Sequence, residues 1–109
     1  KKVKIGIFDD AKSIYEKQLI LIIQLFKLNW KKIKTQKIKT IKNNLSKGTF
    51  HYDKEFLKYN NININKKMKV IDFINLIKAK SFPPHEPLYF YHNRKKIYLS
   101  IKLTKNKYE

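Results

Sequence analysis

The stretch from about Asp10 to about Thr35 constrains this chain more than any other feature. One apolar stripe at helical spacing consists of Tyr15, Leu19, Ile22, Ile23, Phe26, Trp30 and Ile33, with Trp30 expected in the core. A second stripe, which does not coincide with the first, consists of Ile14, Leu21, Leu25 and Leu28. A helix that is apolar over most of its circumference is buried on several sides. Because the rest of the chain is short and rich in lysine, we expect another domain or another subunit to cover part of this helix.

The 109 residues are enough for one small domain. The sequence starts at Lys1 rather than at a methionine, which together with the two-sided helix predicts a fragment of a longer protein. It contains no cysteine, which excludes disulfides, thiolate metal ligands and a cysteine nucleophile within it and favours a reducing, cytoplasmic compartment. The longest apolar run, Leu19 to Ile23, is far shorter than the ~20 residues that span a bilayer, so we expect no membrane partner.

The formal net charge of +18 predicts attraction to polyanions in general. It does not predict a nucleic-acid function by itself. Arg94 is the single arginine, and arginine is the residue that reads guanine and grips phosphate with two parallel hydrogen bonds. Lysine, isoleucine and asparagine are all abundant and share AT-rich codons, so genome bias accounts for much of the lysine content. We therefore do not expect nucleic acid as a partner.

The N-terminal residues 1–8 alternate in polarity, with Val3, Ile5 and Ile7 on one face. This pattern predicts a strand at the edge of a sheet, guarded by lysines on its other face. The strand leads directly into the long helix.

The start of the long helix carries capping signals. Asp9 and Asp10 place short acidic acceptors there, and Ser13 with Glu16 matches a capping box one turn further on.

The chain from residue 31 onward is predicted to be a solvated helix end and an extended linker, which Ile38 and Ile41 pin to the core. Residues 43–48 are a loop by composition, and residues 54–59 suit one short helical turn.

A second helix is predicted from Met68 to Lys80, with Asn65 as its N-cap. Its apolar face consists of Val70, Phe73, Ile74 and Ile77. It must end before Pro83, because a proline disfavours helical geometry in the residue that precedes it.

Two strands are predicted to follow, Leu88–Tyr91 and Lys96–Leu103, around a turn at residues 92–95. In the second strand apolar and polar residues alternate, which is the clearest period-2 pattern in the chain. The predicted order is therefore strand, long helix, loop, helix and hairpin.

Five blocks follow one another along the chain: Asp9–Lys17, Phe26–Lys39, Gly48–Tyr52, Phe73–Pro84 and Tyr89–Tyr91. In this order they resemble the C-terminal part of the folate-dependent N-formyltransferases. The Gly-Thr-Phe-His-Tyr and Phe-Pro-Pro segments are most similar to the branch that formylates sugar nucleotides for bacterial surface polysaccharides, such as lipopolysaccharide. The methionyl-tRNA formyltransferases are more distant relatives.

The resemblance implies an α/β protein, of which this chain is an α+β fragment. Residues 1–42 would complete a Rossmann-like catalytic domain, residues 43–67 would be a connecting loop with a substrate-side segment, and residues 68–109 would be a small helix and hairpin subdomain. The whole enzyme would transfer a formyl group from N10-formyltetrahydrofolate to the amino group of a nucleotide-linked amino-deoxysugar, with dTDP as the expected carrier.

The same resemblance implies which parts this chain lacks. In the family, the donor and the catalytic Asn, His and Asp belong to the N-terminal domain, upstream of the matched blocks. This chain has no Asn-x-His-x-Ser run. We therefore expect it to be inactive alone, to pack on its own N-terminal domain, and to take part in a homodimer.

The resemblance also points to substrate contacts at Phe50, His51, Tyr52 and Lys78. An aromatic ring would stack on the base, and His51 or Tyr52 would donate to a phosphate. The alternative for this cluster is a packed loop. Lys78 stands where the family usually has arginine, and lysine cannot reproduce the bidentate fork of a guanidinium.

Other features leave alternatives open. The family's hairpin usually turns on Asn-Gly, whereas Arg94 follows Asn93 here, which predicts a longer turn or one of another type. His85 and His92 have no third ligand at a sensible spacing, so no metal site is predicted. The hairpin tyrosines fit sheet packing or a subunit interface better than an RNA-stacking surface. The alternative to an enzyme fragment is a small basic module that binds RNA or another polyanion, or that dimerises.

Overall fold

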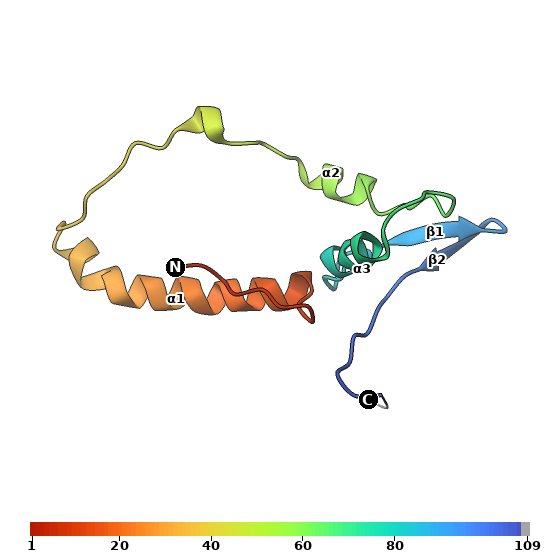
Figure 1. Ribbon diagram of the computed structural model, residues 1–109. Helices are drawn as coiled ribbons and strands as arrows, with labels where there is room; N and C mark the ends of the chain where they lie inside the picture. The colour runs from red at the N-terminus through yellow and green to blue at the C-terminus, as the bar shows by residue number, and fades with distance from the viewer. Residues whose placement is uncertain (108–109) are drawn as a thin grey trace.

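The computed structural model describes residues 1–107, and residues 108 and 109 of the predicted third segment lie outside the described range. The elements are α1 (Ala11–Lys34), a 3-10 turn η1 (Leu45–Lys47), α2 (Asp53–Lys58), α3 (Val70–Ala79), β1 (Tyr89–His92) and β2 (Lys95–Tyr98). Figure 1 shows α3 beside the start of α1, with the hairpin of β1 and β2 beyond it. Helices and a small antiparallel sheet confirm the mixed α and β composition.

α1 starts and ends within one residue of the prediction, because its capping signals are local. The side chain of its N-cap, Asp10, accepts a hydrogen bond from the backbone N–H of Ser13 at 2.8 Å. The hydroxyl of Ser13 accepts one from the N–H of Asp10 at 3.0 Å. The capping box therefore joins Asp10 and Ser13, and the predicted pairing of Ser13 with Glu16 is wrong, because Ser13 occupies the third helical position.

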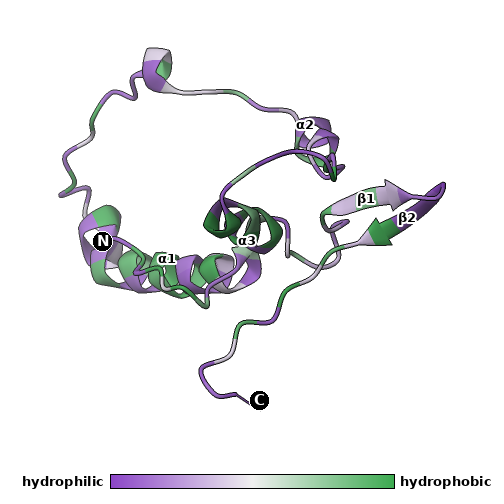
Figure 2. Cartoon of the chain, turned by 45° about the vertical axis from the view of Figure 1, so that its right-hand side comes forward, coloured by the Kyte–Doolittle hydropathy of each residue, from purple (hydrophilic) through white to green (hydrophobic). Residues whose placement is uncertain are grey.

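No residue of α1 is buried within the described chain. Trp30, which we expected in the core, is about half exposed, at 49%. Figure 2 shows apolar residues distributed along α1 among polar ones. This confirms the prediction that the described part of the chain does not cover the helix by itself. No helix among residues 1–107 is both long and apolar enough to cross a membrane.

Residues 1–6 form no strand, and the predicted edge strand is wrong for the described chain taken alone. They run extended beside α1 and reach it through a turn at Ile7 and Phe8 (Figure 1). A strand requires a hydrogen-bonded neighbour, and residues 1–107 provide none for this segment.

The linker between α1 and α2 arcs away from the rest of the chain (Figure 1). Ile41 is 89% exposed and Ile38 is also exposed. The prediction that these two residues pin the linker to the core is wrong, because the arc carries them away from any described apolar surface.

α3 begins at Val70, two residues later than predicted, and its N-cap is Lys69 rather than Asn65. The N–H of Asn65 instead donates to the side chain of Asn63 at 2.9 Å in the preceding turn. Within the helix Ile77 is buried, whereas Val70 is 75% exposed. The predicted apolar face is therefore covered only toward its C-terminal end.

The hairpin pairs Phe90 with Ile97 and turns on Asn93 and Arg94, which adopt φ angles of 47° and 62°. Both turn residues are thus left-handed, as in the two-residue turns that usually carry Asn-Gly. The predicted longer or different turn is wrong, because Arg94 accepts the strained backbone that glycine would adopt freely. β2 also ends at Tyr98, five residues before the predicted end.

The described chain has a very small core. Leu88 is fully buried and Ile77 is 5% exposed, and they are the two buried apolar residues in the described range. The accessible surface is 10540 Å². A compact protein of 13.2 kDa would expose about 6,400 Å². The excess of about 4,100 Å² reflects both the extended segments and the uncovered apolar face of α1.

Candidate functional site

Three of the four predicted substrate contacts lie together just before α2. The rings of Phe50 and Tyr52 meet edge to face, with centroids 4.9 Å apart, and Phe50 is 78% exposed. The Nδ1 atom of His51 lies 3.0 Å from a carboxylate oxygen of Glu55, one helical turn later. The exposed ring pair suits stacking on a base, and a role in binding stays a prediction.

Lys78 lies elsewhere. Its amine donates a hydrogen bond to the backbone carbonyl of Ile7 at 2.6 Å. It lines a hollow between α1 and α3 together with Tyr15 and Phe82, to which the Phe50 and Tyr52 rings do not contribute. The structure therefore brings Phe50, His51 and Tyr52 together and places the Lys78 amine on the N-terminal segment.

Two buried polar residues tie α2 to the second half of the chain. The amide of Asn60, which is fully buried, donates to the carbonyl of Glu86 at 2.8 Å, and its backbone carbonyl accepts from the N–H of Tyr89 at 2.8 Å. The amine of Lys80 donates to the carbonyl of Phe56 at 2.6 Å and lies 3.7 Å from the centre of its ring. Burial lowers the pKa of Lys80. These contacts link α2 and Asn60 to the end of α3 and to the start of the hairpin.

One face of the hairpin carries a polar cluster that sequence reasoning missed. Lys96 forms an ion pair with Glu86, and the hydroxyl of Tyr98 donates to the same carboxylate at 3.1 Å. The Lys96 amine also lies 3.8 Å from the centre of the Tyr89 ring. The hydrogen bond from Lys96 lowers the pKa of Glu86, and Glu86 in turn raises the pKa of Lys96. The strand register pairs Tyr89 with Tyr98 and places Lys96 on the same face, beside the Glu86 carboxylate. A local sequence pattern does not predict such a contact.

The other face of the hairpin is apolar. Phe90 and Ile97 are directly opposed across the two strands, so their side chains share a face. Leu99 follows two residues after Ile97, which keeps it on that face. Tyr89 and Tyr98 oppose each other on the polar face. The hairpin therefore has one polar side, on which Glu86 bonds to Lys96 and Tyr98, and one apolar side.

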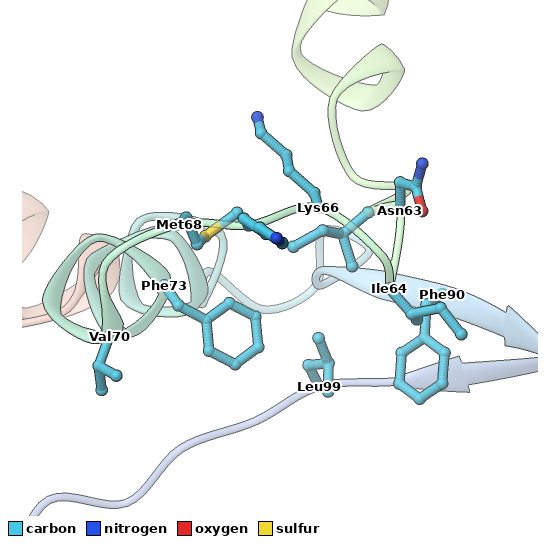
Figure 3. A pocket seen from close by; sticks show the side chains of 10 residues that line it. Asn63, Ile64, Lys66, Met68, Val70, Phe73, Phe90 and Leu99 are labelled. Atoms are coloured by element: carbon cyan, nitrogen blue, oxygen red, sulfur yellow. The ribbon is translucent and has the colours of Figure 1, made fainter.

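The apolar side of the hairpin, α3 and the loop before α3 enclose a groove of about 480 Å³. We call it the α3–hairpin groove; its apolar lining is Ile62, Ile64, Met68, Val70, Phe73, Phe90 and Leu99. Figure 3 shows the rings of Phe73 and Phe90 with Leu99 between them, and Lys66 extending away from these rings. The lining has no acid and no histidine, so the groove offers burial of apolar surface rather than catalytic chemistry. Residues 1–107 contain no group of three or more His, Cys, Asp and Glu residues that could hold a metal ion.

Residues 55–105 match the family model of the N-formyltransferase dimerization C-terminal domain. This confirms the predicted resemblance to the C-terminal part of the N-formyltransferases. The whole α3–hairpin groove lies inside the matched segment, and all of α1 lies outside it.

Two solved structures have the same fold as this chain. One is the crystal structure of a 4-N formyltransferase from Francisella tularensis, with a TM-score of 0.85 and 22% identity over 97% of this chain. The other is a sugar N-formyltransferase from Shewanella sp FDAARGOS_354, with a TM-score of 0.78 and 20% identity over 98% of this chain. The matched region is 44% of each of those chains, so this chain spans less than half of their length. The search of curated proteins found no match.

Proposed function

We propose that this chain is the C-terminal part of a sugar N-formyltransferase. The complete protein would transfer a formyl group from N10-formyltetrahydrofolate to the amino group of an amino sugar carried on dTDP, in the cytoplasm, for lipopolysaccharide synthesis. The observation that supports this proposal is the match of residues 55–105 to an N-formyltransferase domain within a fold that follows a 4-N formyltransferase and a sugar N-formyltransferase over almost the whole chain.

In this proposal α1 and residues 1–8 belong to the catalytic domain, which the missing N-terminal part completes. Three observations support it: within residues 1–107 α1 has no buried residue and residues 1–6 are extended without a sheet partner, and the two solved relatives are more than twice as long as this chain. The sheet of a Rossmann-like domain would supply both a strand neighbour for residues 1–6 and an apolar face for α1. The catalytic Asn, His and Asp and the folate site would lie in that domain.

Phe50, His51 and Tyr52 are the proposed contacts of the sugar nucleotide. Both rings are exposed just before α2, where they meet each other edge to face and the Lys54 amine lies 5.5 Å from the centre of the Tyr52 ring, and a base would stack on their exposed surface. Lys78 is the fourth proposed contact, and to reach a phosphate its amine would have to leave the carbonyl of Ile7.

The test is a formyl-transfer assay on the complete protein with N10-formyltetrahydrofolate and a panel of dTDP-linked amino sugars. The expected result is a product that carries one added formyl group by mass spectrometry. Phe50→Ala and Tyr52→Ala should each raise the KM for the sugar nucleotide roughly five- to 150-fold, which corresponds to the loss of one stacked base contact. Tyr91→Ala, an exposed aromatic on the hairpin, is the control and should leave KM unchanged. Failure to formylate any amino-sugar nucleotide would refute the proposal.

The alternative is a basic module that binds RNA or another polyanion, which the net charge of +18 favours. Its affinity would fall steeply and linearly with salt on a double logarithmic plot. A shallow slope, or no binding near physiological salt, would exclude it.

A further inference from the structure

We infer that residues 31–47, which comprise the last turn of α1 and most of the linker after it, bind the surface of an anionic lipid membrane. The inference goes beyond formyl transfer and does not depend on it. We call residues 31–47 the lysine segment. The segment contains seven lysines and no acid, and all of its residues are exposed. None of the seven amines forms an ion pair with another residue among residues 1–107.

The lysine segment lies at the outside of the structure. Figure 1 shows it leaving the end of α1 and arcing away from the other elements, through η1 and toward α2. Figure 2 shows hydrophobic residues interspersed with hydrophilic ones along this arc. A flat surface can therefore meet the segment without breaking a contact of the described chain.

The distribution of charge around the lysine segment is not explained by base composition alone. A bias toward AT-rich codons raises the lysine content along the whole chain, but it does not by itself exclude acids from one region. Residues 17–52 contain nine lysines and no Asp or Glu, whereas acids stand at both borders, at Glu16 and Asp53. The result is one long stretch of a single sign. Clusters of about four to eight basic residues attract anionic lipid headgroups.

Exposed aliphatic side chains separate the lysines. Ile38 lies between Lys37 and Lys39, and further along Ile41 is 89% exposed and Leu45 is 81% exposed. Inserting these side chains at the boundary between headgroups and acyl chains would remove apolar surface from water. The lysine amines would stay among the headgroup phosphates, because their flexible stems allow the charged end to remain solvated. Charge and aliphatic surface together are what a peripheral membrane contact requires.

The composition of the lysine segment favours a lipid surface over a nucleic acid. Proteins that bind single strands place aromatic rings beside their basic groups so that bases can stack. The lysine segment has no Phe, Tyr or Trp, and it has no arginine to grip a phosphate with two parallel hydrogen bonds. Its exposed isoleucines and leucine would gain nothing from a sugar–phosphate backbone. Binding at a membrane surface needs no segment that spans the bilayer, so the shortness of the apolar runs does not bear on it.

The experiment is co-sedimentation of the complete protein with lipid vesicles. Wild type is expected to bind vesicles made of equal amounts of phosphatidylcholine and phosphatidylglycerol, and not vesicles of phosphatidylcholine alone. A triple variant, Lys37→Gln with Lys39→Gln and Lys42→Gln, should weaken binding about a hundredfold, because each lysine near an anionic surface contributes about fivefold. All three positions are exposed, so the variant should fold, which circular dichroism checks.

The matched control removes the same charge from scattered positions. Lys58, Lys95 and Lys102 are exposed lysines on α2, on β2 and after β2. Changing all three to glutamine should weaken vesicle binding less than fivefold, because they lie outside the lysine segment. The two triple variants have equal net charge, so a difference between them reports the segment and not the overall charge.

A second variant tests the aliphatic contribution. Ile41→Ser keeps every charge and removes an exposed aliphatic side chain. It should weaken binding to the anionic vesicles roughly three- to tenfold, as expected for a side chain that is partly withdrawn from water on insertion. Glycerol phosphate carries the same anionic group without acyl chains, and it should not displace the protein from vesicles.

Absence of binding to the anionic vesicles, or an equal loss in the two triple variants, would overturn the inference. An Ile41→Ser variant that binds vesicles as tightly as wild type would do the same. Displacement by glycerol phosphate would show a site for a phosphate group rather than for a membrane. Displacement by single-stranded RNA at physiological salt would show that the segment is a nucleic-acid site.

Discussion

Leu88 offers the sharpest test of how this fold is held together. Its side chain is fully buried, and its backbone carbonyl accepts a hydrogen bond from the N–H of Leu99 at 2.8 Å, beyond the end of β2. Leu88→Ala removes buried methyl groups and leaves a cavity, which costs about 2–5 kcal/mol. Ile77 is the other buried apolar residue in the described range, so Leu88 contributes a large share of this small core. The cost is a large share of the 5–15 kcal/mol that typically stabilises a domain.

The assay is native-state hydrogen exchange on the complete protein, read at the amide of Leu99. This amide reports directly on opening of the hairpin base, because it donates to Leu88. If exchange follows the opening equilibrium, a loss of 2–5 kcal/mol accelerates it roughly thirtyfold to several thousandfold. Site-resolved exchange separates this local effect from unfolding of the rest of the protein.

Ile41→Ala is the matched control, because Ile41 is a large aliphatic residue with 89% exposure. A change at an exposed site is expected within about 0.5 kcal/mol, which is less than threefold in exchange. Acceleration below about fivefold for Leu88→Ala, or an equal effect of both substitutions, would refute the conclusion that Leu88 anchors the core.

Three further predictions concern α1 and the hairpin turn. Hydrogen bonds from Lys17 foremost, and from the Gly6 N–H and the Ser13 hydroxyl, lower the pKa of Asp9 from 3.8 to about 2, so Lys17→Met should raise it part of the way toward the ordinary value in a carbon NMR titration. Since the native pKa is below the unfolded one, the stabilisation by the Asp9 carboxylate is complete above about pH 4 and is lost as pH falls toward 2; an unchanged titration in the variant would contradict this. Asp10→Ala removes the N-cap of α1 and should cost about 1 kcal/mol in urea unfolding, with a smaller loss for Asp10→Asn, which keeps an acceptor. Arg94→Gly frees a residue at φ 62° and should stabilise the protein by about 0.5–1 kcal/mol, and destabilisation would show that Arg94 contributes a compensating contact.

Local patterns predicted the long helix well and its surroundings poorly. α1 was placed to within one residue because its cap and its apolar period depend only on neighbours along the chain. The edge strand at residues 1–8 failed for the opposite reason, since a strand is defined by a partner that local sequence does not specify. Ile38 and Ile41 were assigned to the core because they are apolar, but burial depends on where the linker passes.

The candidate site divides in the same way. Sequence blocks indicated the family and grouped Phe50, His51 and Tyr52, which are adjacent in the chain and remain together in space. Lys78 was added to that group from the resemblance alone, and the structure places its amine on the carbonyl of Ile7. The sequence pattern did not predict the Glu86–Lys96 ion pair, because the two residues are ten positions apart and separated by a turn.

The sequence by itself determined that a long two-sided helix needs a partner, that a second helix and a hairpin follow it, and that the chain resembles the end of an N-formyltransferase. Those properties reside in periodicity, capping and ordered motifs, which are encoded over short distances. Only the tertiary structure decided which apolar residues remain exposed, and it places separate groups of them on α1, in the linker and around α2, and at the α3–hairpin groove. Burial is a property of segments distant in sequence that meet in space, so a hydrophobic pattern shows which side chains avoid water but not which partner covers them.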